Sequence, residues 1–361
     1  TLINGEWTSG DQIKSEKDFA DYSTKGSNKV WTGPLTDTGF SNTSLYMLNT
    51  AKEQILSTSG TIVDVKTTPI SIKGGGRWNY IGYLPSVNFT VKEALAGYEA
   101  SEGDVVKSQN KFTMYSGKGW IGNLTYMEAG KGYMLLRKDA KDVTFNYPAT
   151  AGSLSGQQKA RTRMSTDEND YLNSSYADNM NVLAIGEELV KGDKVLAYID
   201  GELRGVGDAI DVSGQAMNFI NIVGNDADKV VSFALERNGE VIAYANNTVN
   251  YKSNSVQGTL INPIVLDFRS KDTSAFVYPS PFTTLLNISV SVNTGDDVEI
   301  TIYDVVGQII KRQSDRVTYS GTYHTVWDGK NGVGGVCERG VYFVHIAVNG
   351  EVDTYKVEKK D

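Results

Sequence analysis

The chain has 361 residues, which is more than one hydrophobic core usually holds, so we expect two to four domains. Its 43 acidic and 35 basic side chains leave a net charge of −8, which argues against a nucleic-acid partner, because phosphate binding requires clustered Lys and Arg. The single cysteine, Cys337, excludes an internal disulfide framework and a cysteine-rich zinc site. No apolar run approaches the length of a membrane span, and 37 glycines are typical of many short strands joined by turns.

Two segments near the N-terminus repeat each other. The run Gly10–Ser15 (GDQIKS) recurs 93 residues later as Gly103–Ser108 (GDVVKS). The match continues with Phe19 and Phe112, Tyr22 and Tyr115, Trp31 and Trp120, and finally Leu45–Leu48 and Gly132–Leu135. The offset falls to 87 residues, so the insertions lie between strands, where surface loops tolerate them. We predict a β-rich region 1–148 with an incomplete repeat at 10–71 and a second at 72–148. Phe19 and Phe112, and likewise Trp31 and Trp120, are predicted to be equivalent buried residues.

The second repeat begins with two further elements. Arg77–Leu84 is a strand pattern that ends at a proline, and Val91–Ala96 is a short helix pattern with Thr90 as its N-cap. The first repeat has no equivalent of either before Gly10, and the chain begins without a charged, apolar signal peptide. We therefore expect a mature or trimmed form that is the C-terminal part of a longer protein.

A third unit follows a segment without periodicity. The pattern breaks down over residues 149–170, of which 152–163 are small, polar and basic, and this segment is predicted to be a linker or a draped loop. Residues 171–270 contain about seven short strand patterns, and Asp200-Gly201 and Asn238-Gly239 are the expected two-residue hairpin turns. Such a series of short strands predicts an antiparallel β-sandwich.

Few side chains suggest catalysis. The two histidines, His324 and His345, are too few for zinc catalysis, and a Ser-His-Asp triad would have to recruit one of them across domains. His345 is interpreted as an ordinary strand residue. Cys337, in a glycine-rich run, is interpreted as a turn thiol rather than a nucleophile. We predict no catalytic or cofactor-binding residue.

Two acidic segments leave a calcium site open. Asp226 and Asp228 could bind calcium through hard carboxylate oxygens, and the acidic run 167–170 could do the same. Neither has the ligand spacing and glycine of an EF-hand loop, so solvated acidic turns are the competing interpretation. No other cofactor is expected.

The aromatic residues of the repeats have two interpretations. They could form a platform on which sugar rings stack, or they could fill the core. Most alternate with polar residues, as core-facing strand residues do. Tyr80 and Tyr98 do not follow the clearest alternation and are the predicted ligand contacts.

The last ninety or so residues carry the clearest signal. Apolar and polar residues alternate in each run, and turn sequences lie at Asp304–Gly307 and Asp328–Gly332. In their order and residue types, these motifs resemble the C-terminal sorting domain of proteins exported by the type IX (Por) secretion system. The motif residues are Pro279, Pro281, Phe282, Tyr303, Asp304, Gly307, Trp327, Asp328, Gly329, Gly340, Tyr342 and Lys356. The repeats also resemble modules of large exported bacterial surface proteins.

This resemblance implies a location and a partner. It implies an immunoglobulin-like sandwich at 271–361, contact with the secretion machinery, and export to the outside or the outer-membrane surface of a Gram-negative bacterium. Together with the strand patterns it predicts a mostly all-β chain, with a repeat region that contains one short helix and two antiparallel β-sandwiches.

Several functions fit this architecture. The first is a non-enzymatic, adhesin-like or ligand-binding surface protein whose loops recognise a glycan or a host or matrix protein. The alternative is the C-terminal accessory region of an exported hydrolase, a protease or glycosidase, whose catalytic domain lies upstream. A third is a lectin-like module within residues 1–270.

Overall fold

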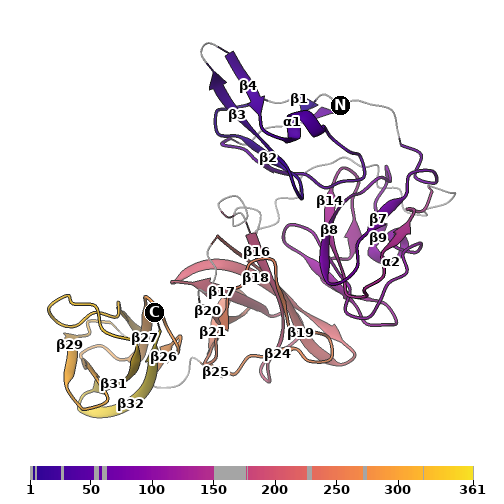
Figure 1. Cartoon of the computed structure of the whole chain (residues 1–361). Helices are drawn as coiled ribbons and strands as arrows, with labels where there is room; N and C mark the ends of the chain where they lie inside the picture. Colours follow the sequence, from indigo (N-terminus) through magenta and orange to yellow (C-terminus); the bar gives the residue numbers. More distant parts are fainter. Residues whose placement is uncertain are drawn as a thin grey trace. The chain divides into compact units, whose positions relative to one another are not determined.

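A computed structural model describes residues 3–4, 6–25, 28–52, 57–58, 63–149, 176, 178–225, 230–270, 275–319 and 321–360. The chain divides into two compact units, residues 1–174 and residues 175–361 (Figure 1). The regular structure of the described residues is nearly all β, with 52% in strands that form mostly antiparallel sheets and 3% in two short helices, so the predicted fold class is confirmed. Asp226, Asp228 and the segments 150–175 and 271–274 lie outside the described residues.

The first repeat forms a four-stranded sheet in the order β4-β3-β2-β5. Its elements are β2 (Gln12–Lys14), β3 (Phe19–Lys25), β4 (Asn28–Thr32), α1 (Leu35–Thr38) and β5 (Met47–Asn49), with a separate pair β1 (Ile3–Asn4) and β6 (Ser57–Thr58). Ile13, Ala20 and Leu35 form a small buried cluster, against which Trp31 and Tyr46 pack. So small a core stabilises this repeat only modestly.

The second repeat has the same strands and an additional edge, in the order β12-β11-β10-β14-β8. Its elements are β7 (Ile70–Ile72), β8 (Arg77–Gly82), β9 (Phe89–Thr90), α2 (Val91–Ala94), β10 (Val105–Lys107), β11 (Phe112–Tyr115), β12 (Trp120–Gly122), β13 (Tyr126–Met127), β14 (Gly132–Arg137) and β15 (Val143–Phe145). Helix α2 begins where expected, because Thr90 and Glu93 form a capping box. A larger core, which includes Ile81, Val106 and Leu135, lies beneath the sheet.

The register of the strands supports the predicted repeat. Phe19 pairs with Lys14 and Phe112 with Lys107, while Trp31 pairs with Tyr22 and Trp120 with Tyr115. Each pair therefore occupies the same place in its own hairpin. The burial prediction for Phe19 is wrong: Phe112 is fully buried, whereas Phe19 is 43% exposed. The physical reason is the smaller core of the first repeat, which does not extend over this end of its sheet.

The middle part of the chain is one continuous sheet around a single core. Its strands run in the order β23-β16-β19-β18-β17-β20-β21-β25, with β22 and β24 joined at the side. They are β16 (Asp178–Ile185), β17 (Lys194–Ile199), β18 (Glu202–Val212), β19 (Gln215–Gly224), β20 (Val230–Arg237), β21 (Glu240–Ala245), β22 (Val249–Asn250), β23 (Val256–Gln257), β24 (Ile264–Val265) and β25 (Phe268–Ser270). Buried residues from strands along the whole sheet, among them Val182, Ala197, Phe233 and Phe268, form one hydrophobic cluster. Both predicted hairpin turns are present, with positive φ at Asp200-Gly201 and Asn238-Gly239.

The C-terminal part consists of two facing sheets. One has the order β26-β27-β30 and the other β29-β28-β31-β32. The strands are β26 (Ala275–Tyr278), β27 (Leu286–Val292), β28 (Asp297–Tyr303), β29 (Ile309–Arg316), β30 (Gly321–Trp327), β31 (Gly340–Val348) and β32 (Glu351–Lys359). Ile288, Val290, Ile300 and Val344 contribute from both sheets to the core. This arrangement is the predicted antiparallel sandwich.

One turn recurs four times, directly before β2, β10, β17 and β28. In each copy a Gly with φ between 84° and 99° precedes an Asp: Gly10-Asp11, Gly103-Asp104, Gly192-Asp193 and Gly295-Asp296. The Asp N–H donates to the carbonyl three residues earlier, over 3.0–3.1 Å. Its Oδ2 accepts the N–H of that same residue over 2.7–2.9 Å. Positive φ at the third position of a turn requires glycine, and the aspartate closes the turn with a charged acceptor.

Candidate functional site

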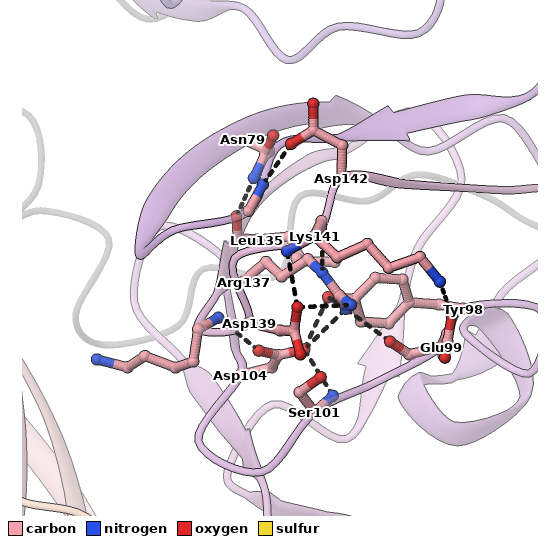
Figure 2. A network of polar contacts seen from close by, with 12 residues as sticks. Asn79, Tyr98, Glu99, Ser101, Asp104, Leu135, Arg137, Asp139, Lys141 and Asp142 are labelled. Atoms are coloured by element: carbon pink, nitrogen blue, oxygen red, sulfur yellow. Dashed lines mark hydrogen bonds and ion pairs between the residues drawn. The ribbon is translucent and has the colours of Figure 1, made fainter.

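The strongest cluster of buried charge lies in the second repeat, around Asp104 and Arg137 (Figure 2). Asp104 Oδ2 accepts the Tyr98 hydroxyl at 2.7 Å and the Ser101 N–H at 2.9 Å, and Oδ1 accepts the Lys138 N–H at 2.7 Å. Arg137 Nη1 lies 3.7 Å from Asp104 Oδ2, and the two side chains are 2% and 0% exposed. All of these groups converge beneath the end of β14.

Arg137 satisfies backbone groups as well as charge. Its Nε donates to the carbonyl of Lys141 at 2.7 Å, and its Nη1 donates to the carbonyl of Glu99 at 2.6 Å. Burial alone would lower the pKa of Arg137, but the Tyr98 hydroxyl and the Asp104 charge raise it, so the guanidinium stays charged. Burial raises the pKa of Tyr98, which keeps its phenol neutral. Because every member is paired, the network holds three chain segments together and offers no reactive group.

The first repeat contains a simpler form of the same arrangement. Asp11 accepts the N–H groups of Thr8 at 2.7 Å and Ala51 at 2.8 Å, just as Asp104 accepts those of Ser101 and Lys138. The position equivalent to Arg137 is Thr50, so this copy has no cation at that position. The aspartate therefore belongs to the architecture of the repeat, and the arginine is an addition in the second copy.

The predicted ligand contact at Tyr98 is wrong. Tyr98 is 6% exposed and packs in the core of the second repeat. Its hydroxyl donates to Asp104 and accepts from Arg137. It departs from strand alternation because it follows helix α2 and lies in no strand. Tyr80 is half-buried in β8, opposite Met134, and its role as a ligand contact stays a prediction.

In the C-terminal sandwich, the aromatic motif residues form a core. Phe282 is fully buried and its ring centroid is 5.2 Å from that of Trp327, which lies 5.0 Å from the ring of Tyr342. The Trp327 Nε1 donates to the carbonyl of Lys330 at 2.8 Å. Phe282 also exchanges backbone hydrogen bonds with Glu358 and Lys360, so the segment that contains Pro279 and Pro281 is attached to the end of β32. These motif residues therefore specify packing.

The polar motif residues form turns. Asp304 Oδ1 accepts the N–H groups of Val306 and Gln308, both at 2.9 Å, around Gly307 with φ of 83°. Asp328 lies 3.4 Å from Lys311 Nζ. Gly329 has φ of 69°, and a Cβ there would meet the Lys359 side chain at 2.8 Å. Gly340 begins β31, Tyr303 contacts His345, and Lys356 is exposed on β32.

Exposed apolar side chains gather at one end of this sandwich, next to those turns. Val305 and Val306 are 66% and 75% exposed in the β28–β29 turn, and Ile309 at the start of β29 is 55% exposed. The loop that carries Val333 and Val336, 93% and 75% exposed, is tied to the same strand by the Gly332 N–H, which donates to the Ile310 carbonyl at 2.8 Å. We call these five residues the valine patch. Several large apolar side chains exposed on neighbouring segments of a soluble domain are candidates for a contact site.

Sequence reasoning did not single out the valine patch. The available signal was the pair Val305-Val306 inside a predicted turn, where polar residues are usual. The exposure of Val333 and Val336 depends on a loop conformation that their sequence alone does not indicate.

Residues 276–360 match the family described as "Secretion system C-terminal sorting domain". The chain ends in a type IX sorting domain. This confirms the resemblance on which the motif residues were chosen, and it implies export to the cell surface or beyond and contact with the type IX machinery. Among the described residues, no helix is long and apolar enough to cross a lipid bilayer.

Solved structures offer only distant likenesses. Latent PorU from Porphyromonas gingivalis is 12% identical, with a TM-score of 0.23. The alignment covers 97% of this chain and 30% of the PorU chain. PorZ is described as a surface component of the type IX system of the same organism. It is 10% identical, with a TM-score of 0.19, and the alignment covers 97% of this chain and 51% of the PorZ chain. The chain thus spans less than two thirds of either protein. Such scores add nothing to the assignment of the sorting domain. No curated protein matches the chain in sequence.

The two histidines of the sorting domain lie in strands. His345 faces Tyr303 with ring centroids 4.5 Å apart. His324 Nδ1 is 2.9 Å from the hydroxyl of Ser289, its cross-strand partner, and burial lowers the pKa of His324. Ser289 is 3% exposed, so its hydroxyl is not open to a substrate. This pair is best explained as a cross-strand contact.

The interpretations of Cys337 and of the acidic segments stay predictions. Cys337 is half-buried beside Gly329, to whose carbonyl its N–H donates, and burial raises the pKa of the thiol. In the described part of the chain, no three His, Cys, Asp or Glu side chains are grouped so that they could hold a metal ion. The calcium candidates Asp226 and Asp228 fall outside that part.

Proposed function

We propose that this chain is a non-enzymatic, exported surface protein that binds a ligand in the manner of an adhesin, and that its sorting domain contacts the secretion machinery through the valine patch. The observation that supports the sorting contact is the exposure of five large apolar side chains at one end of the domain. Water-exposed apolar area of this kind is stabilised by burial against a partner.

Two features support the binding role of the other domains. The buried charges Asp104 and Arg137 are used to connect strands, which leaves them no catalytic task. The sheets are rigid platforms that carry exposed turns, and such turns are where binding proteins place their contacts. The chain in this role recognises a glycan or a host or matrix protein.

The sorting contact is tested by charge substitution in the patch. The double variant Val306→Asp and Val333→Asp should keep the fold, because both side chains are exposed, but should accumulate in the periplasm. The matched control is Val352→Asp, on β32 of the same domain and 57% exposed, which should reach the surface normally. Fractionation with immunoblotting measures the distribution. Equal export of both variants would show that the patch is not the contact.

The sorting role itself has a separate test. Deletion of residues 276–361 should leave the other domains folded, as judged by circular dichroism, and confine the protein to the periplasm. A truncated protein that still reaches the cell surface would show that this domain is not the signal.

The binding role is tested on the purified full chain. We expect saturable binding to a glycan or matrix-protein panel, and no hydrolysis of casein or of polysaccharide substrates. Hydrolysis that survives further purification would contradict the proposal.

A further inference from the structure

A cavity of about 140 Å³ lies within the second unit, where β17, β20 and β21 meet the loop between β26 and β27. It is partly open to solvent. Three tyrosines line it, Tyr198, Tyr244 and Tyr278, together with three short polar side chains, Asp200, Ser232 and Asn287. Concave sites with aromatic walls and a few placed polar groups are the usual form of small-ligand pockets.

One wall is a stack of aromatic rings. The ring centroids of Tyr244 and Tyr278 are 3.9 Å apart at an interplanar angle of 25°. Phe276 and Tyr278, two residues apart on β26, lie side by side with ring centroids 5.5 Å apart, and the Tyr244 ring also lies 4.9 Å from Phe276. Burial raises the pKa of Tyr278, so its phenol remains neutral at physiological pH. A stack with three members holds its ring faces in fixed orientations.

Strand register places a polar group beside a ring on both walls. Tyr198 pairs with Ser232 across β17 and β20, and Tyr278 pairs with Asn287 across β26 and β27. Asp200 follows β17 in the hairpin turn, where the hydroxyls of Thr283 and Thr284 donate to its Oδ1 at 3.2 Å and 2.6 Å. These two bonds fix the carboxylate at the rim of the cavity.

We propose that this cavity binds one neutral pyranose residue of a glycan. A cavity of roughly 150 Å³ accepts benzene, so a pyranose, which carries hydroxyl groups on its six-membered ring, would fill the space here and extend through the open side. A pyranose presents C–H faces to aromatic rings and hydroxyl edges to carboxylate, amide and hydroxyl groups, which is the distribution on these walls. None of the described lining residues is Lys or Arg, and Asp200 repels anions, so phosphorylated and sulfated sugars are disfavoured.

This inference rests on the proposed binding role and assigns it a ligand class. The pocket is built partly by the sorting domain, so sugar binding requires the middle and C-terminal domains to be present in one folded chain. All the described lining residues lie between Tyr198 and Asn287.

The test uses the purified full chain with four probes: glucose, galactose, mannose and N-acetylglucosamine, each followed by saturation-transfer difference NMR. We expect at least one probe to bind with a Kd on the order of 1 mM, as is usual for a single small ring. Asn287→Ala should weaken that binding by about tenfold, because an amide contact to a sugar hydroxyl is lost. Tyr126→Ala, which removes a tyrosine that is 54% exposed in the first unit, should leave it unchanged.

Two results would overturn the proposal: no saturable binding by any probe, or saturable binding that neither Asn287→Ala nor Tyr278→Phe alters. Circular dichroism checks that each variant is folded. Tyr278→Phe removes only the hydroxyl group, so the ring and its packing are kept. Binding to a matrix or glycan panel that survives Asn287→Ala would also overturn the pocket as the ligand site, while leaving the proposed binding role of the chain intact.

Discussion

Tyr244 of the middle sheet stacks on Tyr278 of the sorting domain with ring centroids 3.9 Å apart. The contact is supported by Asp200, which accepts the hydroxyls of Thr283 and Thr284. The sorting domain is therefore joined to the preceding domain by an aromatic contact and by hydrogen bonds to a carboxylate.

Removal of this stack should uncouple the two domains. Tyr244→Ala removes contacts with Phe276 and Tyr278, and we expect a loss of about 1–3 kcal/mol in the free energy of unfolding. Differential scanning calorimetry should show the unfolding of the second unit separating into two transitions. Tyr319→Ala, at a tyrosine that is 48% exposed in the sorting domain, is the control and should change little. A single unshifted transition in Tyr244→Ala would contradict the coupling.

The buried ion pair in the second repeat should contribute far more to the free energy of unfolding than an exposed ion pair does. Arg137→Met leaves Asp104 without its cation, and breaking a buried pair from one side costs about 3–5 kcal/mol. Lys141→Ala removes the exposed pair with Glu99, whose side chains are 71% and 72% exposed, and should cost less than about 1 kcal/mol. Urea unfolding followed by tryptophan fluorescence measures both. Similar losses in the two variants would show that the buried network does not hold the segments of the second repeat together.

The recurring turn predicts a conformational cost at its glycine. Gly103 has φ of 84°, so Gly103→Ala forces a Cβ into the left-handed region at about 1–2 kcal/mol. Gly119 has no positive φ, and a Cβ there meets nothing within 4 Å, so Gly119→Ala should be neutral or slightly stabilising. Thermal unfolding compares the two. If both alanines are tolerated equally, the turn does not require glycine.

Acid should weaken the second unit through Asp193. Burial would raise the pKa of Asp193, but two hydrogen bonds from Arg237 and one from the Val190 N–H hold it below its usual value of 3.8. Because the folded pKa is the lower one, the stabilisation is complete above pH 3.8 and is lost as pH falls below it toward the folded pKa. Chemical denaturation between about pH 5 and pH 2.5 should therefore show a smaller decline in Asp193→Asn than in the parent chain. Parallel declines would place the acid sensitivity elsewhere.

Local patterns predicted much of the fold because they depend on neighbours in sequence. The capping box at Thr90 and Glu93 and the hairpin turns at Asp200 and Asn238 need only a few adjacent residues to form. The repeat was recognisable because matched residues keep their hairpin register. From sequence, the Gly-Asp turn could be recognised only at Gly10-Asp11 and Gly103-Asp104, where it is part of the longer repeat. Gly207-Asp208 has the same two letters and lies inside β18, so the dipeptide alone does not identify the turn.

The amino-acid sequence alone determined the β class, the repeat and the sorting domain, because alternation, turn residues and ordered motifs are local properties. Only the tertiary structure decided which side chains are buried and which converge. Tyr98 joined Asp104 and Arg137, Phe19 remained exposed while Phe112 was covered, and Tyr198 met Tyr278 across a cavity. Those outcomes depend on contacts between residues far apart in the chain. Strand periodicity shows which side chains share a face of a sheet, but not which other segments pack against that face.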